Sequence, residues 1–175
     1  MNNIPLTNTE LATLPLDRQV ALAAQAGYVA DVLSFVALKL PQRVYNTALQ
    51  AAARNGHVDC VAALMDVTNN HTDALIDAAD HGHVECVRML IPGSDPKANS
   101  SEALLCAALG GHVSCMDALY AVSNVQTVLN NLHTYYIESY DMWMILNERF
   151  EAEQQKTALL NNLIHPTTLP HTRKM

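Results

Sequence analysis

Apolar residues recur at helical spacing along most of the chain, in short segments separated by glycine or by polar connectors. Residues 47–54 (TALQAAAR) predict a helix with Thr47 as its N-cap and Gly56 just past its end. Residues 58–65 (VDCVAALM) resume the helical period, with their apolar side chains on one face. Together the two segments predict a helix–turn–helix hairpin around the glycine.

The hairpin pattern occurs four times. Two alanines stand four and three residues before each glycine, a valine stands two residues after it, and apolar residues stand five and eight after it. The aligned glycines are Gly27, Gly56, Gly82 and Gly111, at spacings of 29, 26 and 29 residues. A period of this length indicates a solenoid, because one hairpin cannot bury its apolar face alone. We therefore predict an all-α helical solenoid of about four helix–turn–helix repeats, spanning residues 17–120.

The segments outside the repeats predict helical caps and a tail. TNTE, at residues 7–10, has the spacing of a capping box, and we expect residues 1–16 to cover the open face of the first repeat. Residues 121–165 are expected to form a helical C-terminal cap that ends before Pro166. Residues 166–175 are expected to be a frayed tail.

Composition and charge limit the classes of function. The net charge is −7 and no Lys/Arg cluster is present within the repeats, which disfavours nucleic-acid binding. The apolar stretch 20–40 approaches the length of a membrane span, but Asp31 interrupts it and it follows the repeat pattern, so no membrane insertion is expected. No secretory signal is visible at the start, which favours reduced thiols and a cytoplasmic location.

Three His-x-x-Cys pairs are the first candidates for chemistry: His57 with Cys60, His83 with Cys86, and His112 with Cys115. Each pair offers two ligands where tetrahedral zinc needs four, and neighbouring pairs are separated by about 8–10 Å, the distance between packed helices. The cysteines occupy apolar positions of the pattern, where a free cysteine packs as a small hydrophobe. Gly82 is expected to hold the rings of His81 and His83 apart. We predict no metal site, no cofactor and, because nucleophile and phosphate-loop motifs are absent, no enzyme.

Three units of the repeat resemble the helical half of the ankyrin repeat, with its T-P-L-H-x-A-A-x-x-G-H opening: TALQAAARNGHVDCVAALM, DALIDAADHGHVECVRMLI and EALLCAALGGHVSCMDALY. The first unit has Gly27-Tyr28 in place of Gly-His. The connectors, residues 66–73 and 92–101, are shorter than the usual β-turn finger, so the repeats resemble a short-period, finger-poor variety. The resemblance implies that the histidine after the glycine ties the interhelical turn through hydrogen bonds.

The resemblance also implies a protein–protein interaction module. In ankyrin proteins the two residues before Gly-His commonly face partners, and the matching residues here are Gln25, Ala26, Arg54, Asn55, Asp80, His81, Leu109 and Gly110. They form either a variable binding surface or a solvated one. The aromatic segment 135–150, with Tyr136, Tyr140 and Trp143, is either a cap on the last repeat or a partner anchor.

Other classes of function remain open. The chain is expected to be a monomer or a weak homo-oligomer, and the aromatic segment 135–150 is the candidate contact if it is a homo-oligomeric scaffold. An enzyme would need a deep polar pocket between repeats. The chain also resembles the small, finger-poor ankyrin-like proteins that intracellular bacteria and large viruses direct at host proteins. The resemblance thus extends to an effector acting in the bacterial or host cytosol.

Overall fold

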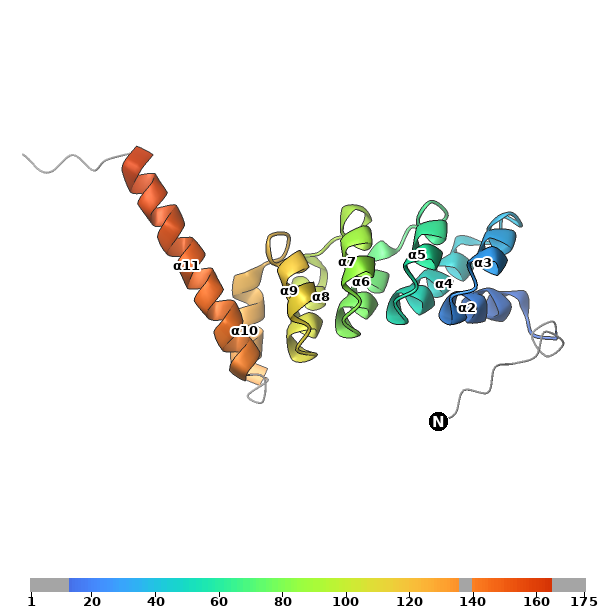
Figure 1. Ribbon diagram of the computed structural model, residues 1–175, viewed down its shortest axis with the longest axis horizontal. Helices are drawn as coiled ribbons and strands as arrows, with labels where there is room; N and C mark the ends of the chain where they lie inside the picture. Colours follow the sequence, from blue (N-terminus) through green and yellow to red (C-terminus); the bar gives the residue numbers. More distant parts are fainter. Residues whose placement is uncertain (1–12, 136–139, 165–175) are drawn as a thin grey trace, which may run out of the picture.

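The computed structural model describes residues 13–135 and 140–164, and within these ranges every regular element is a helix. Four helical hairpins stack in a row, and two further helices follow at the C-terminal end (Figure 1). The hairpins are α2 (Leu16–Ala26) with α3 (Val29–Val36), α4 (Gln42–Arg54) with α5 (Val58–Met65), α6 (His71–Asp80) with α7 (Val84–Leu90), and α8 (Ala98–Leu109) with α9 (Val113–Tyr120). The predicted all-α solenoid is confirmed.

The helices of the hairpins form two rows. The first helices α2, α4, α6 and α8 each pack on the next, and α10 (Val125–Tyr135) continues this row by packing on α8. The second helices α3, α5, α7 and α9 form the other row. The last helix, α11 (Tyr140–Ile164), packs on α10 and then leads away from the stack (Figure 1).

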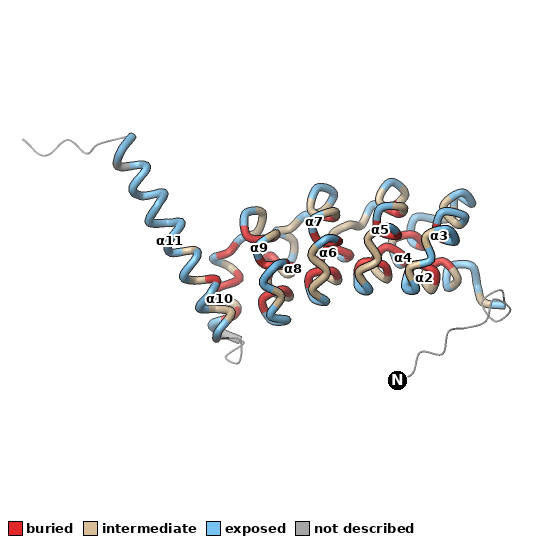
Figure 2. The backbone as a smooth tube through the Cα atoms, viewed as in Figure 1, coloured by how far each residue is buried: buried red, intermediate tan, exposed pale blue. Residues whose placement is uncertain are grey.

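Small residues let the first helices approach one another closely. The alanine pairs that precede the turn glycines are buried in all four hairpins, and Ala52 and Ala53 of α4 have no exposed surface at all. Leu64, Leu90 and Leu119 fill the space between hairpins and are also fully buried, each contributing about 1.5–3 kcal/mol. Buried residues therefore run as a continuous band along the stack (Figure 2).

Each hairpin turn is closed by a glycine in the left-handed conformation. Gly56 has φ of 74°, its amide donates to the carbonyl of Ala53 at 3.2 Å, and the next amide, of His57, donates to Ala52 at 3.0 Å. This pair of bonds is a Schellman motif, which satisfies the last carbonyls of α4. Left-handed backbone favours glycine because a β-carbon would crowd the neighbouring carbonyl.

The histidine after each glycine reaches the preceding repeat. His57 Nε2 donates to the carbonyl of Gln25 at 2.9 Å, and His83 Nε2 donates to the carbonyl of Arg54 at 3.0 Å. His112 does the same in the last hairpin. The backbone amide of each histidine ties its own turn, as the resemblance implied, and the side-chain bond in addition ties consecutive repeats together. Tyr28, which replaces histidine in the first repeat, is exposed and has no earlier turn within the described chain to contact.

Helix α4 begins earlier than predicted, so the assignment of Thr47 as its N-cap is wrong. Thr47 lies inside the helix, where its Oγ1 donates to the carbonyl of Arg43 at 3.1 Å. The buried hydroxyl of Tyr45 explains the early start. It accepts from the amide of Leu40 at 2.8 Å and donates to the carbonyl of Phe35 at 3.0 Å. These bonds fix the first turn of α4 against the end of α3.

The predicted connector 92–101 is also partly helical, because it contains most of the 3₁₀ turn Ile91–Gly93 and the start of α8. A histidine that the repeat pattern did not single out joins two connectors. Nδ1 of His71 lies 2.9 Å from the carbonyl oxygen of Gly93, and Nε2 lies 3.1 Å from that of Met65. One imidazole thus fixes both connectors without a long finger.

Helix α11 packs on the stack through one face near its start. Leu146 is buried, and Trp143 and Phe150 are half-buried against the core. Residues 151–161 are all exposed, as Figure 2 shows for the outer length of the helix. The predicted N-terminal cap, residues 1–16, lies largely outside the described residues, and the predicted tail, residues 166–175, lies entirely outside them.

We predict that Gly56→Ala destabilises the protein more than Gly111→Ala. Both glycines are left-handed, so each substitution costs about 1–2 kcal/mol of backbone strain. A β-carbon at Gly56 would also stand 2.6 Å from Nδ1 of His83, whereas one at Gly111 meets nothing within 4 Å. Displacing the imidazole adds about 1 kcal/mol for the lost hydrogen bond. Urea unfolding measures the difference, and adding His83→Ala should remove it; an equal loss in the two single variants would contradict the prediction.

A second prediction concerns the attachment of α11. Leu146→Ala should lower the free energy of unfolding by about 2–5 kcal/mol, because the leucine is 2% exposed in the core. Met144→Ala is the matched control, since Met144 is exposed on the same turn and should change stability by less than about 0.5 kcal/mol. Thermal unfolding followed by circular dichroism compares the two variants. Similar transitions would show that α11 is not packed on the stack as described.

Candidate protein-binding surface

The residue pairs in front of the turn glycines lie at the ends of the first helices, and all of them are exposed. They are Gln25 and Ala26 at the end of α2, Arg54 and Asn55 at the end of α4, Asp80 and His81 at the end of α6, and Leu109 and Gly110 at the end of α8. Because these helices stack on one another, the pairs form a row along one edge of the solenoid. We call this row of eight residues the turn edge.

The interrepeat histidines hold the backbone of the turn edge in place. The carbonyls that they bond belong to Gln25, Arg54 and Asp80, the same residues whose side chains were predicted to face a partner. The side chains of the turn edge are thus carried on a backbone that is fixed before any binding event. A surface of this kind loses little conformational entropy when it binds.

The side chain of Arg54 is engaged within the chain. Its Nη2 lies 2.6 Å from Oδ1 of Asp77, and Nε donates to the same oxygen at 3.2 Å. The hydrogen bond with Asp77 and the charge of that carboxylate raise the pKa of Arg54. The Arg54 side chain is still 57% exposed, so the ion pair contributes only about 0–1 kcal/mol to stability while it fixes the position of the positive charge.

This ion pair is the last step of a polar ladder between α4 and α6. Asn46 Nδ2 donates to Asn69 Oδ1 at 2.9 Å, and Gln50 Nε2 donates to Asp73 Oδ2 at 3.2 Å. Each partner stands 23 residues after its donor, as it does for Arg54. Sequence reasoning missed the ladder. The available signal was the four-residue spacing of Asn46, Gln50 and Arg54, which is matched 23 residues later by Asn69, Asp73 and Asp77.

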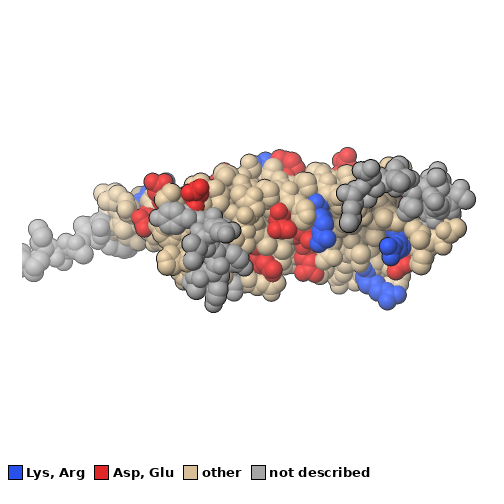
Figure 3. Space-filling view, turned by 90° about the horizontal axis from the view of Figure 1, so that it is seen from below, with Lys and Arg blue, Asp and Glu red and all other residues tan. Residues whose placement is uncertain are grey.

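The middle repeats carry a negative charge. Residues 44–90 contain six Asp and Glu residues against two Arg residues, a net charge of −4. Both arginines lie in ion pairs, Arg54 with Asp77 and Arg88 with Glu85. In the view from below, Asp and Glu side chains gather over the middle of the molecule beside one small group of basic atoms (Figure 3). The two repeats that contribute Arg54 and Asp80 to the turn edge are therefore acidic as a whole.

The aromatic segment contributes to packing where it is described. Trp143 is half-buried against the core, and its ring lies 5.8 Å from the ring of His133 in α10. Tyr136 lies outside the described residues, and of Tyr140 the structure describes only the backbone at the start of α11. The described part of this segment thus joins α11 to the stack.

The His-x-x-Cys pairs are divided between the surface and the core. The ring of His57 lies against the preceding turn, whereas Cys60 is fully buried. Burial raises the pKa of all four thiols, to about 11 for Cys86 and Cys106, so they stay protonated at neutral pH. Catalytic and metal-binding cysteines need a lowered pKa, because they act as thiolates. Among the described residues, no group of three His, Cys, Asp or Glu side chains could hold a metal ion.

The rings of His81 and His83 stack, so the prediction that Gly82 holds them apart is wrong. Their centroids are 6.5 Å apart and their planes differ by 13°. Gly82, with φ of 76°, turns the chain so that the residues on both sides face the same way. Both rings are committed to backbone carbonyls, His81 to that of Asp77 at 3.0 Å and His83 to the preceding repeat.

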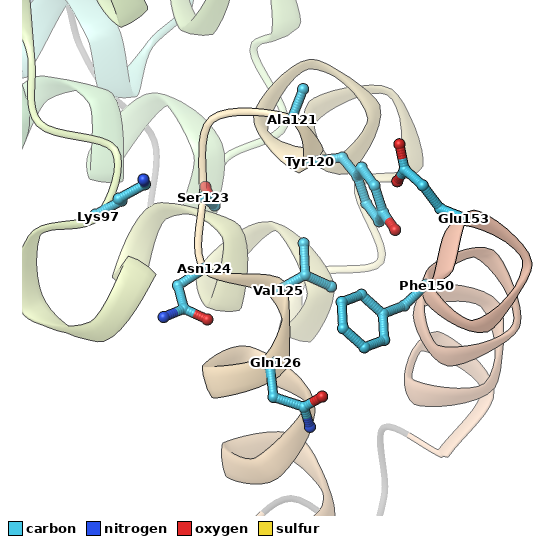
Figure 4. A pocket seen from close by; sticks show the side chains of 9 residues that line it. All are labelled: Lys97, Tyr120, Ala121, Ser123, Asn124, Val125, Gln126, Phe150 and Glu153. Atoms are coloured by element: carbon cyan, nitrogen blue, oxygen red, sulfur yellow. The ribbon is translucent and has the colours of Figure 1, made fainter. Parts of the chain in front are cut away.

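A shallow hollow of about 410 Å³ lies between the turn after α9 and helix α11 (Figure 4). Its side chains come from Lys97, Tyr120, Ala121, Ser123, Asn124, Val125, Gln126, Phe150 and Glu153. Burial raises the pKa of the Tyr120 hydroxyl, and Arg149 covers the other part of that ring at 4.6 Å from its centroid. The lining includes neither a histidine nor a cysteine, the residue types whose perturbed pKa would mark an enzyme site between repeats.

Comparison with known proteins agrees with the geometry. A family model of ankyrin repeats, in three copies, matches residues 20–100, which run from α2 into the start of α8. None of the curated proteins compared with the chain is significantly similar to it. No helix within the described ranges is long and apolar enough to cross a membrane. Ankyrin repeats are generally protein–protein interaction modules. Residues 20–100 of the chain are thus identified as ankyrin repeats.

Proposed function

We propose that this protein binds a partner protein through the turn edge. The observation that carries the proposal is the contrast between a repeated scaffold and a varied surface. The buried alanines and the interrepeat histidines repeat along the stack, whereas the exposed pairs in front of the glycines are amide, basic, acidic or apolar in turn. Solenoids that bind proteins combine a constant core with variable surface positions in this way.

The charge of the middle repeats favours a partner with a basic surface. Asp80 and Asp59 are exposed close to the turns, and residues 44–90 carry a net charge of −4. Carboxylates of this kind attract lysine and arginine side chains during the encounter and disfavour acidic partners. Leu109, which is also exposed, adds an apolar contact toward the C-terminal end of the edge.

The aromatic segment is the second part of the proposed surface. We propose Tyr136 and Tyr140 as contacts, because tyrosines are enriched where interfaces bury one side of a ring. Trp143 itself packs against the core, so its proposed part in binding is to hold the start of α11 in place rather than to act as an isolated anchor. A Trp143→Ala variant would therefore lower the stability of the C-terminal helices together with binding.

The proposed location is the cytosol, where thiols stay reduced, since all four cysteines are free. The likeness to proteins that intracellular bacteria and large viruses direct at their hosts makes a host protein the proposed partner. Crosslinking capture from a host-cell extract, followed by mass spectrometry, identifies the candidates.

We predict that Asp80→Lys weakens binding of a basic partner by at least about tenfold, or 1.4 kcal/mol, because it places a positive charge in the middle of the turn edge. Asp66→Lys is the matched control. It makes the same charge change at the exposed end of α5, where the connector begins, and should alter affinity by less than about threefold. Isothermal titration at two salt concentrations measures both. Equal effects of the two variants would contradict a site on the turn edge.

The opposite result is predicted for Arg54→Gln. This change removes the guanidinium that neutralises Asp77, so the surface becomes more acidic and affinity for a basic partner should rise about two- to fivefold. Because the Arg54 side chain is exposed, the free energy of unfolding should fall by no more than about 1 kcal/mol. The same titration tests this variant. Loss of binding would mean that Arg54 itself contacts an acidic group of the partner, and would overturn the proposed basic partner.

A further inference from the structure

One exposed side of α11, next to the side that packs on the stack, has an ordered pattern of its own. Ile145, Ala152 and Leu159 follow one another at intervals of seven residues and are all exposed, Ile145 by 43% and Leu159 by 65%. Seven residues make close to two helical turns, so the three side chains lie in one line along the helix. Ala152 lies about 160° around the helix from Phe150, which packs on the core. Ala152 and Lys156 stand at the edge of this side, where they also border the hollow between α11 and α9. We call this line, with Glu148 and Lys156, the outward face of α11.

The charges on the outward face are arranged about Ala152. Glu148 stands four residues before it and Lys156 four residues after it, and both are exposed. The two are eight residues apart, about 12 Å along one helix, so they cannot form an ion pair with each other. From one end to the other, the outward face is apolar, acidic, small, basic and apolar. When this order is reversed, the acidic and basic positions exchange places. The face is therefore complementary to the same face of a second copy that runs in the opposite direction.

We propose that two copies of this chain form a two-fold symmetric dimer in which the outward faces of α11 pack antiparallel about Ala152. In this register Ile145 meets the partner's Leu159, and Glu148 meets the partner's Lys156. Two-fold symmetry then repeats both contacts, giving two apolar pairs and two ion pairs from one surface. Ala152 meets its own symmetry mate, and its small side chain lets the helices approach closely.

Charge selects this arrangement over a parallel one. In a parallel pair, Glu148 would face the partner's Glu148 and Lys156 would face the partner's Lys156, which is repulsive at both positions. Packing also leaves the outward face open to a second helix. The stack contacts α11 through Leu146 and its half-buried neighbours and through the ion pair of Arg149 with Asp117. Residues 151–161 are all exposed, and α11 leads away from the stack (Figure 1). The antiparallel register places the two stacks toward opposite ends of the helix pair.

The proposed dimer contact differs from the aromatic segment 135–150, which the sequence made the candidate contact of a homo-oligomer. Trp143 and Phe150 face the core of their own chain, so the dimer uses a different side of the same helix. A single helix pair is a small interface, and we expect a dimer that dissociates on dilution. The proposal does not depend on the turn edge: Asp80→Lys should leave dimerisation unchanged.

Charge reversal across the dimer provides the test. Size-exclusion chromatography with light scattering should give a mass that approaches twice 19.1 kDa as concentration rises. Glu148→Lys and Lys156→Glu each place like charges together at both symmetric contacts, and each should raise the dissociation constant at least tenfold. The double variant Glu148→Lys/Lys156→Glu exchanges the charges and should return the constant to within about threefold of the wild-type value.

Two leucines give a matched control for the apolar contact. Leu159→Ala should weaken the dimer, whereas Leu160→Ala should not, because Leu160 is 49% exposed but lies about 100° away around the helix. Circular dichroism should show the same helix content in every variant, since all the replaced side chains are exposed. A wild-type protein that stays monomeric at all concentrations would overturn the proposal. So would single charge reversals that leave the dimer intact, or a double variant that fails to restore it.

Discussion

The architecture depends on one close approach, between the glycine of each turn and the histidine of the next repeat. A β-carbon on Gly56 would stand 2.6 Å from the ring of His83, so only glycine admits the imidazole at that position. Only from there does the ring reach the carbonyl of Arg54, at 3.0 Å. The same geometry needs a neighbour on each side, which accounts for both ends of the series: Tyr28 replaces the histidine where no described turn precedes it, and the space beside Gly111 is open.

The same approach separates the scaffold from the binding surface. The histidines bond to backbone carbonyls, which every residue type possesses, so the side chains at Gln25, Arg54 and Asp80 can differ without loss of the bond. The backbone carbonyls, which are the same for every residue type, thus provide rigidity, and the side chains, which differ, provide specificity. A solenoid with short connectors can in this way offer a pre-ordered surface without long fingers.

The repeats, the buried alanines and the core cysteines could be predicted from the sequence because a solenoid places equivalent residues in equivalent surroundings. Features that arise from contacts between different units could not. Thr47 reads as an N-cap locally, but the hydroxyl of Tyr45, bonded to the preceding hairpin, starts α4 earlier. The ion pair of Arg54 with Asp77 joins residues 23 positions apart on neighbouring helices. Trp143 could be placed on a helical face from its spacing, but which side met the core depended on how α11 crosses α10.

The proposed dimer would change how the proposed binding surface acts. Each copy carries one turn edge, and a two-fold axis through Ala152 would hold two of them at a separation set by helices rather than by flexible linkers. A partner with two basic segments at the matching distance would then bind the second edge as an intramolecular step, at a high effective concentration. A partner with one segment, or with two at another distance, would gain nothing. The same rigidity that lowers the entropic cost of binding at one edge would thereby select among partners by the spacing of their basic segments.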